Sequence, residues 1–333
     1  MICDATICIF SFLINTDNIS ITGALPHYRR YSNHSMSKRN FLRTIQFICL
    51  SGLLLVSGSC EKFDGEQTVP AYLKIDSIYI QTDYSTEGTA FQSITDAWVY
   101  VDDELIGAFQ LPAEFPVLAN GKHEVTIMPG IKKNGIAATR TNYPFCDPIV
   151  KNIELTEDST VSLGGQKTVY QTTTEFFMIE NFDGVVLSLD TTKRSVAGIQ
   201  QTPSGWPGTF EGSHSGLIRM DSAGSMFECT NKTDFVIPAA PVFMELHFMT
   251  NIPVAAGVFL YGYSSISQAP VVYLSPTEGQ WKKIYIDLTN ALNSQTGMVN
   301  FRIFFNAIQP AGVQNAEIRL DNIKVLTRDL SKK

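Results

Sequence analysis

The sequence is poor in charged residues, in histidine and in basic clusters. Charged side chains make up 17% of the 333 residues, and the formal net charge is −7. Nucleic-acid binding depends on a concentrated excess of Lys and Arg, so this balance argues against a nucleic-acid partner. After residue 60 only His123, His214 and His247 remain, and none has the spacing of a zinc motif.

The segment Thr44 to Ser59 is uncharged, but it is shorter than the roughly 20 apolar residues of a membrane-spanning helix. It follows the basic residues Lys38, Arg39 and Arg43, and it ends in small residues before Cys60. This order predicts a signal peptide over residues 36–59 that begins at Met36. Residues 1–35 precede a complete signal peptide, so we interpret them as a mis-assigned start or a disordered segment.

The segment Ser57-Gly58-Ser59-Cys60 resembles the lipobox of bacterial lipoproteins, although Ser57 stands where Leu is usual. The resemblance implies lipid on Cys60 and an outer-membrane anchor in a Gram-negative bacterium. A plain cleaved signal peptide or a buried helix is the alternative. Residues 60–70 are expected to form a tether, whose acidic part, Glu61 to Gln67, resembles surface-export signals.

Few cysteines would remain in the processed chain. Beside Cys60 these are Cys146 and Cys229, which do not form a disulfide framework. They fall in different predicted domains, so two buried free thiols are expected rather than a bridge.

From Ala71 onward, short β-rich runs alternate with Gly, Pro, Asn and Asp turns, which predicts an all-β chain. Ala97–Val101, a turn at Asp102–Glu104 and Leu105–Phe109 predict a hairpin. The stretch from Val99 to Val125 resembles PEGA-type, Ig-like small β-sandwiches of bacterial surface proteins. We therefore expect a small β-sandwich over residues 71–165 and a linker over 166–175.

The following part, 176–327, resembles the galactose-binding-like jelly rolls that include many carbohydrate-binding modules, and residues 328–333 form a tail. The elements that carry this resemblance are Glu180–Gly184, Glu211–Met220, Val242–Phe248, Gln280–Leu288 and Ile318–Val325. The resemblance implies a larger jelly-roll sandwich. It does not specify a sugar, because one fold serves many ligands.

No motif predicts catalysis. The run Gly212-Ser213-His214-Ser215-Gly216 has His at its centre and precedes a predicted strand, so it lacks the serine elbow of hydrolases. Asp102, Asp103 and Glu104 lie at a hairpin tip, where they are expected to be solvated. A divergent glycoside hydrolase, which would need two converging carboxylates, stays an alternative.

Candidate binding residues fall into two groups. Jelly-roll modules often hold a structural calcium, and Glu180, Asp183 and Asp321 match the positions of its ligands. Aromatic rings stack on sugars, which makes Trp206, Tyr261 and Tyr263 candidate ligand contacts, whereas Trp281 is expected to pack.

The sequence thus favours a lipid-anchored, non-catalytic envelope protein whose jelly roll binds glycan. The alternative is a structural or protein-interaction subunit of an outer-membrane or surface complex.

Overall fold

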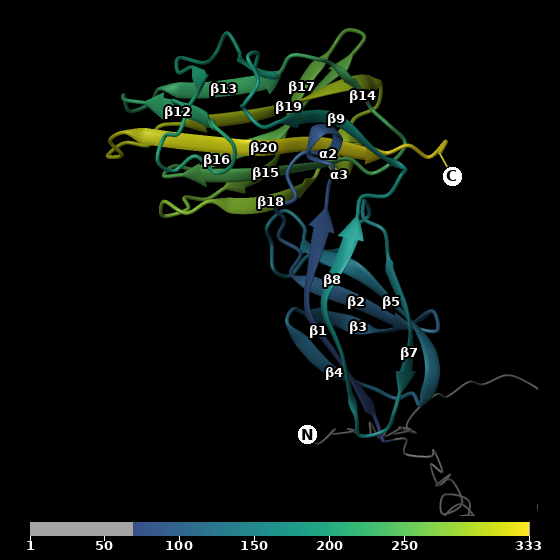
Figure 1. Cartoon of the computed structure of the whole chain (residues 1–333). Helices are drawn as coiled ribbons and strands as arrows, with labels where there is room; N and C mark the ends of the chain where they lie inside the picture. Colours follow the sequence, from purple (N-terminus) through teal and green to yellow (C-terminus); the bar gives the residue numbers. More distant parts are fainter. Residues whose placement is uncertain (1–68, 333) are drawn as a thin grey trace, which may run out of the picture. The chain divides into compact units, whose positions relative to one another are not determined.

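The computed structural model describes residues 69–332, which are built almost entirely from strands, turns and loops (Figure 1). The predicted all-β class is confirmed. No helix within these residues is long and apolar enough to span a membrane. The expected signal peptide, the lipid site Cys60 and most of the tether lie outside the described residues.

The first eight strands form two sheets that pair only among themselves. One sheet has the order β4-β1-β8, and the other has the order β3-β2-β5-β6 with β7 also on β5. Their bounds are β1 (Ala71–Gln81), β2 (Asp96–Val101), β3 (Glu104–Gln110), β4 (Ala113–Val117), β5 (Gly121–Lys132), β6 (Arg140–Asn142), β7 (Ile149–Leu155) and β8 (Thr160–Val169). A short helix, α2 (Tyr84–Glu87), lies in the β1–β2 connection.

The hairpin predicted around residues 97–109 is present as β2 and β3. Asp102 and Asp103 form its turn with φ values of 48° and 67°, the left-handed conformation that two-residue hairpin turns require. The Asp102 carboxylate accepts hydrogen bonds from the His123 ring at 2.6 Å and from the Glu124 N–H at 3.0 Å. The turn residues therefore also fasten the neighbouring strand β5.

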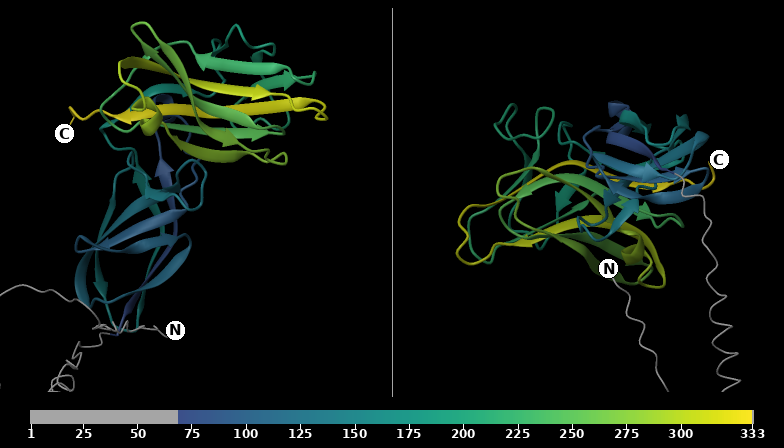
Figure 2. Two further views of the ribbon diagram at one scale, coloured as in Figure 1. Left: turned by 180° about the vertical axis from the view of Figure 1, so that it is seen from behind. Right: turned by 90° about the horizontal axis from the view of Figure 1, so that it is seen from below.

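The remaining strands form the larger, jelly-roll sandwich, whose two layers are seen from further directions in Figure 2. The β19 sheet has the order β10-β13-β19-β16-β17 with β14 on β19, and the β20 sheet has the order β11-β12-β20-β15-β18 with β9 on β20. The bounds are β9 (Thr174–Glu180), β10 (Leu189–Thr191), β11 (Ile199–Gln201), β12 (Gly216–Met220), β13 (Met226–Asn231), β14 (Phe235–Val236), β15 (Phe243–Thr250), β16 (Val254–Gly262), β17 (Ile266–Leu274), β18 (Lys282–Asp287), α3 (Thr289–Leu292), β19 (Met298–Ile308) and β20 (Ala316–Arg328).

Alternation along β20 decides which side chains reach the outer face of its sheet. Ile318 and Leu320 enter the core between the two sheets, and Ile323 and Val325 enter it further along. The phase changes at Asp321 and Asn322, where Asn322 has a φ of 46° and the pairing with β15 shifts register. This irregularity explains why the sequence of β20 alternates only in part.

The two sandwiches have separate cores that share a boundary. Cys229 lies in the core of the jelly roll and Cys146 in the core of the smaller sandwich, and both thiols are free and buried, as expected. The segment predicted as a linker, 166–175, overlaps the end of β8 and the start of β9, and Tyr170 within it is buried. The exact domain boundaries remain predictions.

Candidate functional site

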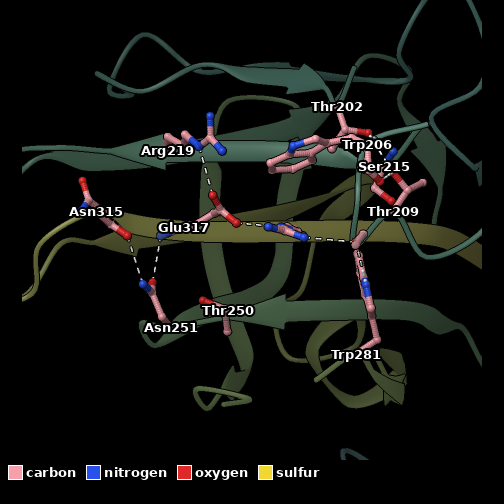
Figure 3. A network of polar contacts seen from close by, with 12 residues as sticks. Thr202, Trp206, Thr209, Ser215, Arg219, Thr250, Asn251, Trp281, Asn315 and Glu317 are labelled. Carbon is pink, nitrogen blue, oxygen red and sulfur yellow. Dashed lines mark hydrogen bonds and ion pairs between the residues drawn. The ribbon is translucent and has the colours of Figure 1, made fainter. Parts of the chain in front are cut away.

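The outer face of the β20 sheet is divided into a covered half and an open half. In the covered half, Phe243 packs edge-on against Tyr143 and Phe145 of the smaller sandwich, with ring centroids 6.1 and 5.4 Å apart. In the open half, β12 and β20 present Arg219, Glu317 and Arg319, and no strand of the smaller sandwich pairs there. The open half is therefore the candidate functional site (Figure 3).

Three side chains in the open half form what we call the Arg–Glu–Arg array. Glu317 accepts a hydrogen bond from Arg219 Nε at 3.0 Å and one from Arg319 Nε at 2.7 Å, one on each carboxylate oxygen (Figure 3). Arg319 also donates through Nη1 to the Gly208 carbonyl. The terminal N–H groups of Arg219 have no hydrogen-bond partner within residues 69–332. Planar donors held in place by a carboxylate suit the recognition of hydroxyl or carboxylate oxygens.

A cavity of about 750 Å³ opens beside this array. Arg219, Asp221 and Glu317 supply its charged lining, and Val196, Met220 and Ala316 supply apolar surface. A smaller cavity of about 150 Å³ lies on the other side of Glu317, against Met249, Asn251 and Arg319. Small-molecule sites combine concave apolar surface with a few placed polar groups, and this composition fits that description.

Asn251 extends the polar network beyond the array. Its side-chain oxygen accepts from the Glu317 N–H at 2.8 Å, and its amide nitrogen donates to the Asn315 carbonyl at 3.0 Å (Figure 3). These bonds hold the end of β20 next to the loop after β15. The pairing of β12 with β20, which places Arg219 opposite Glu317, fixes the same backbone from the other side.

The loop that carries Trp206 is fastened across its base. Thr202 N–H donates to the Ser215 carbonyl at 2.8 Å, and Ser215 N–H donates to the Thr202 hydroxyl at 2.9 Å. Gly205 and Gly208 have φ values of 68° and 88°, which glycine adopts without strain. The Pro/Gly-rich sequence thus forms a tight loop whose ends are tied together.

Trp206 itself is half-buried and contacts the array. The guanidinium carbons of Arg319 and Arg219 lie 4.4 and 5.1 Å from the centre of its ring, within the range of cation–π attraction. The predicted ligand contact Trp206 is therefore brought together with two arginines that the sequence analysis did not single out.

Trp281, expected only to pack, also fixes this loop. Its indole N–H donates to the Gly208 carbonyl at 3.0 Å, and Arg319 donates to the same oxygen at 3.1 Å. The loop is thus joined to both β18 and β20, which limits how far Trp206 can move relative to the array.

The two candidate tyrosines lie elsewhere. Tyr261 is on β16 in the β19 sheet, where the Arg302 guanidinium lies 5.5 Å from its ring centre. Burial raises the pKa of Tyr261. The strand ends at Gly262, so Tyr263 falls in the following turn and is 95% exposed. The structure therefore does not bring Tyr261 or Tyr263 together with Trp206.

The three candidate calcium ligands each accept hydrogen bonds from the protein. Glu180 accepts from the Phe182 and Ser188 N–H groups, and Asp183 accepts from the Ser213 and His214 N–H groups. Over residues 69–332, no three His, Cys, Asp or Glu side chains are grouped as a metal site would require.

Asp321 is the most buried of these carboxyls. It accepts from the Ser215 hydroxyl at 2.6 Å and from the Asn322 N–H at 2.8 Å. Burial raises the pKa of Asp321 to about 7, although these hydrogen bonds favour its ionised form. The predicted calcium site stays a prediction.

His247 lies on β15, next to β20 in the sheet. Its side chain is buried, Nδ1 has no hydrogen-bond partner within the described residues, and its ring stacks on Phe210 at 4.0 Å. Burial lowers the pKa of His247 to about 2, so its ring is uncharged at neutral pH.

Comparison with known proteins gives only distant likenesses. No family model and no curated protein matches the chain. A xylan-binding domain from CBM 22 is 11% identical, with a TM-score of 0.32 over 46% of this chain and 96% of its own. The CBM22-2 xylan-binding domain of Paenibacillus barcinonensis Xyn10C is 15% identical, with a TM-score of 0.34 over 45% of this chain and 98% of its own.

A third structure comes from an enzyme. The enzymatically active domain of bacteriophage CBA120 tailspike protein 4 is 11% identical, with a TM-score of 0.31 over 41% of this chain and 18% of its own. Because these identities are low and the scores lie below 0.5, function has to be inferred from the side chains of this chain.

Proposed function

We propose that this chain is a non-catalytic glycan-binding protein of the cell envelope and that the open half of the β20 sheet is its binding site. The observation that carries this proposal is the Arg–Glu–Arg array beside Trp206, whose members Arg219 and Glu317 line a cavity of about 750 Å³. Sugars present hydroxyl groups around an apolar ring face, so their recognition needs oriented polar groups next to aromatic surface.

The arrangement supports binding rather than glycoside hydrolysis. Hydrolysis needs one carboxyl as a proton donor and a second as a base or nucleophile. Of the carboxylates that line the larger cavity, Glu317 already accepts an arginine N–H on each of its oxygens. A carboxylate held in this way serves to orient donors.

The test is a glycan-array screen of the chain from Glu61 to Lys333 beside its Trp206→Ala variant. We expect the variant to lose about tenfold or more in affinity, which corresponds to about 1.4 kcal/mol. Tyr261→Ala is the matched control, because it removes an aromatic ring from the other sheet. Loss of binding in Tyr261→Ala alone would move the site to the β19 sheet, and no binding by the unmodified chain would refute glycan recognition.

A protein-interaction role is the second candidate, and one surface favours it. On the edge strand β17 and the turn before it, Tyr263, Ile266 and Tyr273 are 95%, 70% and 73% exposed. Exposed apolar groups on a sheet edge are typical of surfaces that meet another protein. This role would be supported if the unmodified chain bound no glycan but could be cross-linked to a partner protein. The cross-link should then be lost in an Ile266→Lys variant.

We also propose that lipid on Cys60 anchors the chain to the outer membrane and that the acidic tether displays the binding domain at the cell surface. The basis is the sequence order of basic, apolar and small residues before Cys60. Metabolic labelling with a fatty acid should mark the unmodified chain and not Cys60→Ala. Protease treatment of intact cells should cut a surface-exposed chain, whereas an uncut chain would place it on the inner face.

A further inference from the structure

The smaller sandwich places an aromatic side chain next to the open half of the β20 sheet. Phe91, in the connection between α2 and β2, lies edge-on against Phe210, with ring centroids 5.1 Å apart. The same ring is 6.4 Å from His247 in β15. A residue from the first sandwich thus reaches the loop that also carries Trp206.

This connection is anchored on both sides of Phe91. The Lys324 ammonium donates to the Thr89 carbonyl at 2.8 Å, and the Ser93 N–H donates to the Tyr285 hydroxyl at 2.9 Å. Both partners belong to the jelly roll, and Lys324 and Tyr285 are buried. The position of Phe91 is therefore set by contacts with the jelly roll, and not only by the smaller sandwich.

Phe91 remains 55% exposed in spite of this anchoring. Complete burial of a phenylalanine side chain would favour folding, so a fixed and exposed ring gains little from packing. Single exposed apolar residues are common on protein surfaces, but Phe91 is continuous with other rings.

Those rings form a row that leads back to the Arg–Glu–Arg array. The Phe210 and Trp281 ring centroids are 5.4 Å apart. Trp281 and Arg319 donate to the same Gly208 carbonyl, and Arg319 lies over Trp206. The rings of Phe91, Phe210 and Trp281 therefore contact one another in turn, and Trp281 is joined to Trp206 through the Gly208 carbonyl and Arg319.

His247 supports the centre of this row without adding charge. Its buried, uncharged ring stacks on Phe210 with 22° between the ring planes. An uncharged support suits a neutral apolar ligand surface, such as the ring face of a sugar, and does not attract an anion. The polar array at one end and the uncharged rings along the row together match an extended glycan rather than a single sugar unit.

We infer that Phe91 forms a distal subsite of the glycan site, so that both sandwiches contribute to binding and the site takes an oligosaccharide. This inference rests on the proposed glycan-binding function and adds the size of the ligand and the role of the smaller sandwich. The smaller sandwich is then part of the recognition surface and not a passive spacer. Continuity with the candidate site is what favours glycan over a protein partner at this surface.

The test measures affinity by calorimetry for a size series, from disaccharide to hexasaccharide, of the oligosaccharide that gives the strongest array signal. The proteins carry both sandwiches and are unmodified, Phe91→Ala, Phe91→Trp or Trp206→Ala. We expect Phe91→Ala to bind the longer members about two- to tenfold more weakly and the shortest member normally, since one aromatic contact is lost. Phe91→Trp should retain the affinity for the longer members.

Control measurements separate a subsite from a structural role. Tyr79→Ala removes another exposed ring of the smaller sandwich that lies outside the row, and it should bind every member normally. Melting temperatures confirm that each variant is folded. An equal loss in Phe91→Ala for all lengths would overturn the inference, because Phe91 would then act only by positioning Phe210.

The outcomes also separate this inference from the proposed function. Weaker binding in Trp206→Ala with normal binding in Phe91→Ala at every length would overturn the distal subsite and leave the glycan site intact. Absence of binding by the unmodified protein would overturn both. A loss in Phe91→Ala that grows with ligand length, together with a loss in Trp206→Ala at every length, would support a site shared by the two sandwiches.

Discussion

The two halves of the outer face of the β20 sheet each hold a carboxylate between two cationic side chains, but they differ in burial. In the covered half, Glu245 pairs with Lys283 at 2.6 Å, and the two side chains are 2% and 4% exposed. In the open half, Glu317 pairs with Arg219 and Arg319, whose side chains are 57% and 15% exposed. The same charge arrangement therefore has two different consequences on one sheet.

Burial makes the Glu245 group a structural junction. Besides Lys283, it accepts hydrogen bonds from the Tyr143 and Tyr170 hydroxyls of the smaller sandwich. Burial by itself would raise the pKa of Glu245, but attraction by Lys283 and Lys324 outweighs it and lowers the pKa to about 2. An ionised carboxylate in this place is tolerable only because its partners are present.

The Glu317 group is more exposed, so it can contact a ligand. Water and ligands reach its arginines, so the pairing contributes little to stability but holds donors in fixed directions. The comparison teaches that a charged triad on a sheet becomes a junction where another domain covers it and a recognition surface where it stays open.

The largest expected effect is the loss of stability in Glu245→Gln. The variant keeps the size of the side chain but leaves Lys283 and Lys324 buried without a counter-charge, which costs about 3–5 kcal/mol. Urea unfolding monitored by circular dichroism measures this change. Glu317→Gln is the matched control on the open half, and equal losses in the two variants would contradict the comparison.

Lowering the pH should remove much of the difference in unfolding free energy between the unmodified chain and Glu245→Gln. A carboxyl whose folded pKa is depressed contributes stability above its ordinary pKa of 4.5, and this contribution is lost as the pH falls toward 2. The gap in unfolding free energy should therefore narrow across this window, by about 1.4 kcal/mol per pKa unit. A gap that stays constant in a pH series of unfolding curves would show that Glu245 is not the titrating group.

Local features of the fold could be predicted from the sequence. The hairpin around Asp102 and the strand after Gly216 depend on turn chemistry and on alternation within a few residues. Trp206 could be placed in an exposed loop because Pro203 and the neighbouring glycines exclude a strand there. These features need no knowledge of distant partners.

The array could not be predicted, because its members meet only through strand pairing. Arg219 and Glu317 are 98 residues apart in the sequence and become neighbours when β12 pairs with β20. A signal was present in Glu317-Ile318-Arg319-Leu320, where charged residues alternate with apolar ones and so share the outer face. Tyr263 lies outside the strand that carries Tyr261, because that strand ends one residue earlier at Gly262.

A medium effect is expected for Glu317→Gln, on binding and not on folding. The glutamine amide keeps one acceptor oxygen but has an N–H donor in place of the other and no charge, so it can no longer hold both Arg219 and Arg319 for a ligand. We expect affinity in the glycan assay to fall by about tenfold while the unfolding free energy changes by less than about 1 kcal/mol. Asp234→Asn, which disrupts the ion pair with Arg302 on the other sandwich surface, is the control. It should bind normally, and a similar loss of affinity there would show that the array has no special role.

The smallest effect is expected from removal of divalent cations. Glu180, Asp183 and Asp321 accept N–H or O–H groups, and within residues 69–332 no three carboxylate, His or Cys side chains are grouped as an ion would require. Thermal unfolding in excess EDTA should therefore match that in calcium to within a degree or so. Ligands that bind only the folded state raise its stability by mass action, so a clear drop in melting temperature on chelation would establish the calcium site. That outcome would also show that these three carboxylates, of which Glu180 and Asp321 are buried and Asp183 is exposed, can converge on an ion.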